Sequence, residues 1–113
     1  MLKITTLKKN SYEFLLVVSY KISEEFIEEL INKFKKLIEK NAEFENVDRW
    51  GKRRLAYLIN KEIDGYYVLF NFKSVPDFPE EISRISEITD NILRYIIIKK
   101  SNEIIYKKEG QVN

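Results

Sequence analysis

The sequence predicts an α+β fold in which two helices cover one face of a four-stranded antiparallel sheet. Two segments carry apolar residues at the three- and four-residue spacing of a helix, and four segments have the apolar runs or alternation of strands. They follow one another in the order β-α-β-β-α-β. The chain has 113 residues, a length that suits one domain with one hydrophobic core.

The first strand is predicted at 12–19, where a nearly continuous apolar run is typical of a strand in the middle of a sheet. Ser23 follows as a helix N-cap, with Glu24 and Glu25 near the positive end of the helix dipole. Asn41 ends this helix. Its apolar face consists of residues three and four apart: Phe26, Ile27, Leu30, Ile31, Phe34, Leu37 and Ile38.

The second and third strands are predicted to form a hairpin. The extended segment 44–60 is interrupted at Gly51, and an isolated glycine in a strand pattern indicates a bulge or bend. The turn signal is strongest at Asp64-Gly65. The third strand, 66–73, has apolar alternate positions that we assign to the core: Tyr66, Val68, Phe70 and Phe72.

The second helix begins between Pro76 and Pro79, and β-branched residues at 96–98 favour a last strand at 93–98. Two βαβ crossovers joined by a hairpin give the ferredoxin-like two-layer sandwich. We expect this domain to span 12–100, between an N-terminal extension at 1–11 and a flexible C-terminal tail at 101–113.

The composition excludes several classes of function. The chain has no cysteine and no histidine, which removes thiolate metal sites and the commonest general base at neutral pH. No stretch reaches the roughly 18 apolar residues of a membrane span. We therefore expect a cytoplasmic protein that is not an enzyme, needs no metal or cofactor, and has no membrane partner or small-molecule substrate.

One face of the predicted sheet stays uncovered and is too apolar to be wholly solvated, which marks it as a partner surface. The expected outward residues of the first and third strands are Glu13, Leu15, Val17, Tyr67, Leu69, Asn71 and Lys73. The alternative is a register shifted by one residue, which would place this set in the core.

Basic residues gather around the central glycine of the second strand and beside the last strand. These residues are Arg49, Lys52, Arg53, Arg54, Arg94, Lys99 and Lys100. Guanidinium groups suit phosphate because they are planar, permanently charged and bidentate. Trp50, Tyr57 and Tyr67 supply surfaces for base stacking. The alternative is a solvated edge in which the cations pair with neighbouring carboxylates.

The decamer Gly-Lys-Arg-Arg-Leu-Ala-Tyr-Leu-Ile-Asn at 51–60 resembles the signature of the bacterial small-subunit ribosomal protein six family. Its flanks at 46–50 and 65–72, and the segment 88–95, are similar to that family as well. The resemblance covers roughly 12–99. It implies a structural constituent of the small ribosomal subunit, which binds the central domain of small-subunit ribosomal RNA together with small-subunit ribosomal protein eighteen.

The resemblance and the basic cluster together identify candidate site residues. The candidates for ribosomal RNA binding are Lys52, Arg53, Arg54, Arg94 and Lys99. Tyr67 and Leu69 are the candidates for the interface with the partner protein, and Gly51 is expected to form a structural bulge. The sequence departs from the family by having about ten residues before the first strand, and its C-terminal tail inherits no role.

Three other functions share this order of elements. An RNA-recognition-motif-like module that binds single-stranded RNA would place its stacking residues at Tyr66 and Val68, and Asp64 stands where that family has a basic residue. An acylphosphatase needs a phosphate-binding loop, but 21–23 holds neither glycine nor arginine. A ligand-binding regulatory domain lacks a marked pocket, and the paired glutamates are interpreted as solvated helix faces.

Overall fold

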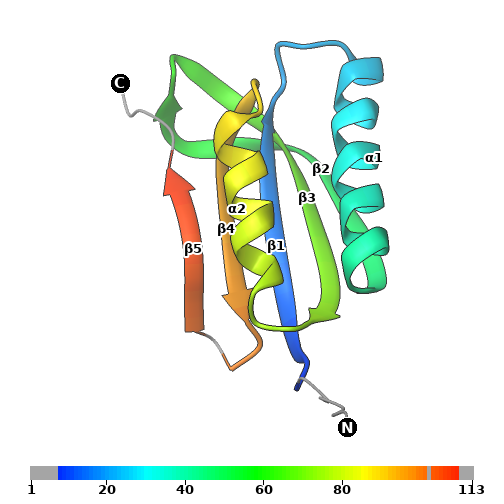
Figure 1. The fold of residues 1–113 in the computed structure, drawn as a ribbon. Helices are drawn as coiled ribbons and strands as arrows, with labels where there is room; N and C mark the ends of the chain where they lie inside the picture. Colours follow the sequence, from blue (N-terminus) through cyan, green and yellow to red (C-terminus); the bar gives the residue numbers. More distant parts are fainter. Residues whose placement is uncertain (1–7, 102, 110–113) are drawn as a thin grey trace, which may run out of the picture.

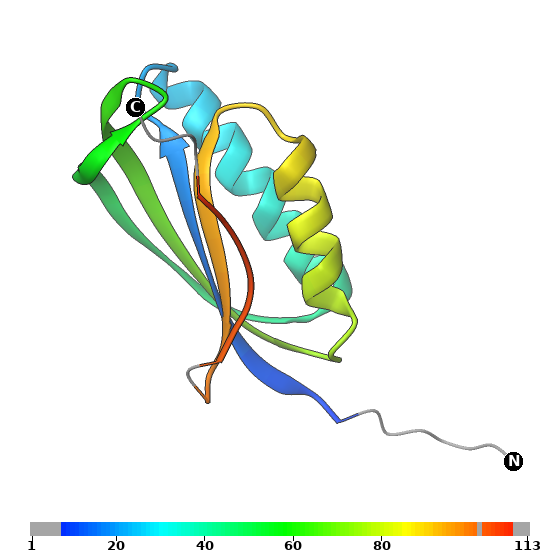
Figure 2. The same ribbon diagram turned by 90° about the vertical axis from the view of Figure 1, so that its left-hand side faces the viewer.

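The computed structural model describes residues 8–101 and 103–109, which form five strands and two helices. The strands lie in one antiparallel sheet in the order β2-β3-β1-β4-β5, and both helices cover the same face (Figures 1 and 2). The bounds are β1 Asn10–Ser19, α1 Glu24–Asn41, β2 Glu43–Ile59, β3 Glu62–Ser74, α2 Phe78–Ile88, β4 Ile92–Lys99 and β5 Glu103–Glu109.

The predicted α+β fold, with two helices on an antiparallel sheet, is confirmed, but the sheet has five strands and not four. The additional strand β5 pairs with β4 and lies inside the segment 101–113, where we expected a flexible tail. Charged residues flank its three apolar ones, Ile104, Ile105 and Tyr106, and hide the strand pattern. Of the expected extension 1–11, Asn10 and Ser11 belong to β1, and residues 1–7 lie outside the described part of the chain.

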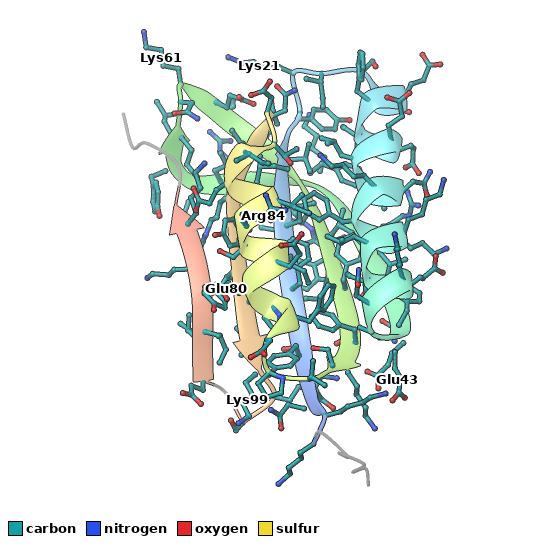
Figure 3. All side chains as sticks on the ribbon, in the orientation of Figure 1. Lys21, Glu43, Lys61, Glu80, Arg84 and Lys99 are labelled. Carbon is teal, nitrogen blue, oxygen red and sulfur yellow. The ribbon has the colours of Figure 1, made fainter. Side chains whose placement is uncertain are left out.

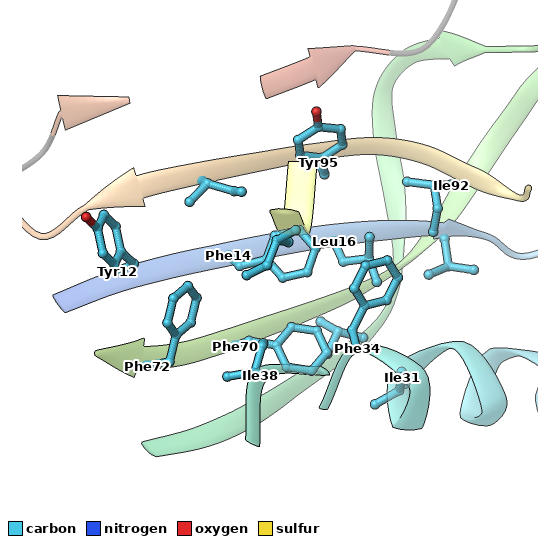
Figure 4. Packing of buried hydrophobic residues seen from close by; sticks show 14 of the residues in the cluster. Tyr12, Phe14, Leu16, Ile31, Phe34, Ile38, Phe70, Phe72, Ile92 and Tyr95 are labelled. Carbon is cyan, nitrogen blue, oxygen red and sulfur yellow. The ribbon is translucent and has the colours of Figure 1, made fainter. Parts of the chain in front are cut away.

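The main core lies between the helices and the sheet (Figure 4). Phe14 of β1 is at its centre, with its ring centroid 5.4 Å from those of Phe34 on α1 and Phe70 on β3. Burying a side chain of this size contributes about 1.5–3 kcal/mol. The structure buries the predicted core residues Val68, Phe70 and Phe72, whereas Tyr66 is half-buried near the start of α1.

The start of α1 has the predicted cap. The Ser23 hydroxyl accepts a hydrogen bond from the backbone N–H of Phe26 at 3.3 Å. This bond satisfies one of the amides that have no partner in the first turn of a helix. Neither helix in the described part of the chain combines the length and hydrophobicity that a membrane crossing requires.

A second, smaller core lies on the opposite face of the sheet. The turn end of the β2–β3 hairpin lies on the side away from the helices (Figure 2). Two of its side chains, Leu55 and Ile59, bury Val17 and Leu93 there. Gly65 allows this packing, because a Cβ atom at that position would be 2.6 Å from Cγ1 of Val17. The hairpin is therefore anchored to the sheet face and does not project freely.

Candidate functional site

The strand register places three cross-strand rows in the middle of the face opposite the helices, which we call the open face. The first of these rows, the one of the three nearest to the β2–β3 turn, is Gly51, Tyr67, Val17 and Arg94. The second row is Asp48, Leu69, Leu15, Ile96 and Lys107. The third row is Asn46, Asn71, Glu13, Ile98 and Ile104.

The middle of the second row is apolar. Leu15 has Leu69 directly across on β3 and Ile96 directly across on β4. All three side chains are half-buried, although no helix or loop in the part of the chain that the structure describes packs over them as in the two cores. Three adjacent aliphatic side chains on an uncovered sheet face are typical of a surface that a partner completes.

The first row is not open along its whole length. Val17, which we expected on the uncovered surface, does lie on this face but is completely buried. Leu55 and Ile59 of the hairpin cover it. The prediction that Val17 is available to a partner is therefore wrong, because the second core occupies that end of the face.

A pair of stacked aromatic rings forms the β2 end of the first row. The rings of Trp50 and Tyr67 have centroids 6.2 Å apart and planes inclined by 10°. The indole Nε1 of Trp50 donates a hydrogen bond to Asp48 Oδ2 at 3.2 Å. Trp50 is 40% exposed and Tyr67 is half-buried. The pair offers a flat surface with a fixed orientation at the edge of the sheet.

Gly51 lies where β2 is irregular. Arg49 pairs with Val68 and Gly51 with Tyr67, so Trp50 is an additional residue of β2 relative to β3. Gly51 has φ of +81°, a conformation that glycine adopts without steric cost. The irregularity sets two consecutive residues, Trp50 and Gly51, opposite Tyr67, so Trp50 stacks on the open face, whereas Arg49 contacts the helix side.

Arg49 takes part in the packing of α1 on the sheet. Its guanidinium donates a hydrogen bond to the carboxylate of Glu28. This hydrogen bond, together with the charge of Arg49, lowers the pKa of Glu28. The same bond raises the pKa of Arg49. The basic run in the sequence is thus divided, and this arginine holds β2 to a helix.

The three basic residues after Gly51 alternate between the two sides of the sheet. Lys52 lies on the helix side, with Nζ 3.7 Å from Asp64 Oδ2 and 5.1 Å from the ring centroid of Tyr20. Arg53 pairs with Gly65 and therefore lies in the register of the open face. Arg53 and Arg54 are exposed and have no ion-pair partner among the described residues.

The structure brings Arg94 to the same end of the sheet as this cluster but places Lys99 elsewhere. Arg94 is in the first row, across from Val17. Lys99 pairs with Tyr12 at the other end of β4, and Figure 3 shows it at the end of the molecule opposite to Lys61 in the β2–β3 turn. Four of the five predicted RNA-binding residues therefore lie toward one end of the sheet, divided between its two sides, and Lys99 lies at the other end.

Two parts of this surface were not expected from the sequence. The hairpin tip exposes Leu58 and Ile63 beside its basic residues and beside Tyr57, which the sequence had indicated. Strand β5 adds Ile104 and Lys107 to the open face. The signal for β5 was the adjacent apolar triplet at 104–106.

The chemistry available on this face is binding. Within 8–101 and 103–109, no group of three or more metal-ligating side chains is close enough to hold an ion. What the face offers is aliphatic contact area, one aromatic stack and the guanidinium groups of Arg53 and Arg94 toward one end. Such groups position a partner through apolar contacts and phosphate hydrogen bonds.

Comparison with known proteins identifies the family. The family model described as ribosomal protein S6 matches residues 11–99. The chain belongs to the ribosomal protein S6 family. The predicted resemblance is thereby confirmed.

Relatives in other organisms support this membership. Small ribosomal subunit protein bS6 of Caldanaerobacter subterraneus subsp. tengcongensis is 51% identical over 90 residues, which cover 79% of this chain and 95% of the relative. The protein of the same name from Clostridium perfringens strain 13 is 48% identical over 90 residues, covering 79% and 95% respectively. The crystal structure of 30S ribosomal protein S6 from Thermotoga maritima superposes with a TM-score of 0.78 at 28% identity, and covers 81% of this chain and 88% of that one.

Membership in the S6 family decides the broad function. The chain is a structural protein of the small ribosomal subunit, a ribonucleoprotein of the cytoplasm that takes part in translation, and it is not an enzyme. The family match ends at residue 99. Strand β5 therefore lies beyond the part of the chain that the family model describes.

Proposed function

We propose that this S6-family protein binds the central domain of small-subunit ribosomal RNA together with small-subunit ribosomal protein eighteen. One observation carries the proposal: the open face has an aliphatic centre, and beside it at the hairpin end lie Arg53 and Arg54, which have no ion-pair partner within the described ranges. An aliphatic surface suits a protein and clustered arginines suit phosphate. The two partners would occupy adjacent parts of one face.

The RNA contact is assigned to the hairpin end. Arg53, Arg54 and Arg94 lie there together with Lys52, whose charge Asp64 partly offsets. Their contacts with backbone phosphates would displace condensed counterions and give a salt-dependent affinity. Such contacts recognise the shape of folded RNA and not its sequence. Lys99 would reach a separate stretch of RNA, since it lies at the other end of β4.

Alanine substitution of Arg53 or Arg54 tests this assignment. Each variant should weaken binding to the rRNA central domain in the presence of protein eighteen, and should lower the slope of log affinity against log salt by about 1. Fluorescence anisotropy at a series of salt concentrations measures both quantities. Lys36→Ala is the matched control, because this exposed lysine lies on α1. Unchanged affinity and slope in both arginine variants would refute the RNA assignment.

The protein contact is assigned to Tyr67 and Leu69. Leu69 belongs to the aliphatic centre, and Tyr67 presents the aromatic stack beside it. Covering these side chains removes apolar area from water and stabilises the complex.

Leu69→Asp should therefore reduce the affinity for protein eighteen at least about tenfold, since an uncompensated charge would be buried. Calorimetric titration measures this, with the exposed helix-face change Ile88→Asp as control; unimpaired binding would remove Leu69 from the interface.

The geometry disfavours the RNA-recognition-motif alternative. Its stacking positions would be Tyr66 and Val68. Val68 is completely buried in the main core, and Tyr66 stacks on Tyr20 with centroids 6.5 Å apart on the helix side. Neither side chain lies on the open face. The aromatic pair that does lie there, Trp50 and Tyr67, is at the edge of the proposed protein contact.

A further inference from the structure

Strand β5 has two faces that differ in what they contact. On the helix side, Ile105 and Tyr106 pack against the main core. Lys108 Nζ lies 3.6 Å from Glu87 Oε1 of α2. The pairing with β4 and these contacts are sufficient to hold the strand in place. On the open face it carries Ile104, which is 53% exposed.

The exposed isoleucine continues a surface that begins on the central strands. Ile104 lies directly across from Ile98, which lies directly across from Glu13. Ile98 in turn is on the same face of β4 as Ile96 in the second row. Packing inside this chain does not require an apolar residue at 104, because the strand is held from its other side. This arrangement is typical of a residue whose contact lies in another molecule.

The charge of the third row favours a protein over RNA. Glu13 is half-buried and has no ion-pair partner among the described residues. A carboxylate in the middle of a surface repels phosphate and attracts a cationic side chain. Ile98, directly across from Glu13 on β4, and Leu15, on the same face of β1, form with it a surface that fits an apolar segment with one lysine or arginine.

We propose that β5 enlarges the protein-binding surface of the open face, and that the partner protein covers Ile98 and Ile104 while a basic side chain of that partner meets Glu13. This inference rests on the proposed function, because it extends the contact assigned to Leu69. It gives the segment beyond the family match a role in recognition. The interface thereby extends from β3 across β1 and β4 to the added edge strand.

Single substitutions in the full-length chain test the inference. Ile104→Asp should weaken the affinity for protein eighteen about tenfold, and Ile104→Thr should weaken it less while keeping a β-branched residue in the strand. Glu13→Gln should weaken it a few-fold, and this loss should shrink at high salt. Ile88→Asp on the helix face is the control, and circular dichroism verifies that each variant is folded.

The outcomes separate this inference from the function on which it rests. Loss of binding with Leu69→Asp, but full affinity with both Ile104 variants, would overturn the role of β5 and leave the proposed function intact. Full affinity with Leu69→Asp and the Ile104 variants alike would refute both. If Ile104→Asp lowered the affinity for the rRNA fragment alone and left protein binding unchanged, the surface would belong to RNA and the inference would be wrong.

Discussion

Two glycines of the β2–β3 hairpin are needed for different reasons. Gly51 has a left-handed φ of +81°, but a Cβ atom there would meet nothing within 4 Å. At Gly65 a Cβ atom would lie 2.6 Å from Val17 Cγ1 and 3.3 Å from Leu55 Cδ2. The sequence suggested a bulge at Gly51 through its position inside a strand. The predicted turn at Asp64-Gly65 is wrong, because both residues lie in β3 and the turn is at Asn60 and Lys61. The need for glycine at 65 depends on the second core, which no local pattern contains.

Gly65→Ala should lower the free energy of unfolding by about 1–3 kcal/mol, because the added methyl group overpacks a buried cluster. Urea denaturation measures this loss. In the double variant with Val17→Ala the cost of the added methyl should shrink, since the closest atom is gone, and the two changes should be strongly non-additive. Additive free energies would mean that the clash with Val17 is not the cause.

Tyr95 joins the core to a polar group at the surface of α2. Its hydroxyl lies 2.6 Å from Ser83 Oγ and donates to Glu87 Oε2 at 2.9 Å. Burial raises the pKa of Tyr95 above its ordinary value of 10.0, and the hydrogen bond with Glu87 adds to this effect. The folded protein therefore favours the protonated Tyr95 side chain over the phenolate more strongly than the unfolded chain does.

The stability that Tyr95 provides should be complete below pH 10 and should decrease as the pH rises above that value, because the unfolded chain then loses its proton first. Melting temperatures between pH 8 and pH 11 measure the decrease. Tyr95→Phe keeps the ring but removes the hydrogen bonds, so it should cost about 0.5–1.5 kcal/mol at neutral pH. The melting temperature of this variant should also fall less steeply between pH 8 and pH 11 than that of the unmodified chain. An equal slope in the two proteins would show that Tyr95 does not cause the pH dependence.

At the scale of the elements, the sequence predicted what local patterns determine. The helix at 24–41 followed from its cap and apolar spacing, and the core side of β3 followed from alternation. Strand β5 was missed because its stability comes from β4 and α2, which no local pattern contains. The burial of Val17 was missed for the same reason, since Leu55 and Ile59 reach it only after the hairpin folds back.

A chain that ends at Ser101 should still fold, because the family match ends at residue 99 and the remaining strands enclose the main core. It should lose about 1–3 kcal/mol, mainly from the partly buried Ile105 and Tyr106. Circular dichroism and urea denaturation measure the secondary structure and the loss. A truncated chain without a cooperative transition would show that β5 is required for folding.

For the whole molecule, the net charge of +2 conceals an uneven distribution. In three dimensions the basic residues of the sequence cluster separate: Arg49 lies against α1, Lys52 lies beside Asp64, and Arg53 and Arg54 are exposed. The sequence located the cluster but could not assign the faces, because the irregularity at Gly51 changes which residues point which way. Lys99 was predicted to act with these residues because it is basic and flanks the last strand, but it lies at the other end of β4.

The order of the strands has a consequence for biosynthesis. β1 is made first but lies between β3 and β4, and its hydrogen-bonding partners are residues 65–74 and 92–99. Two of the four strand pairings, those of β1, therefore join segments far apart in the chain, which slows folding. In the nascent polypeptide β1 therefore stays unpaired on one side until residues 92–99 have been translated. The centre of the sheet is thus completed only after β4 has been synthesised.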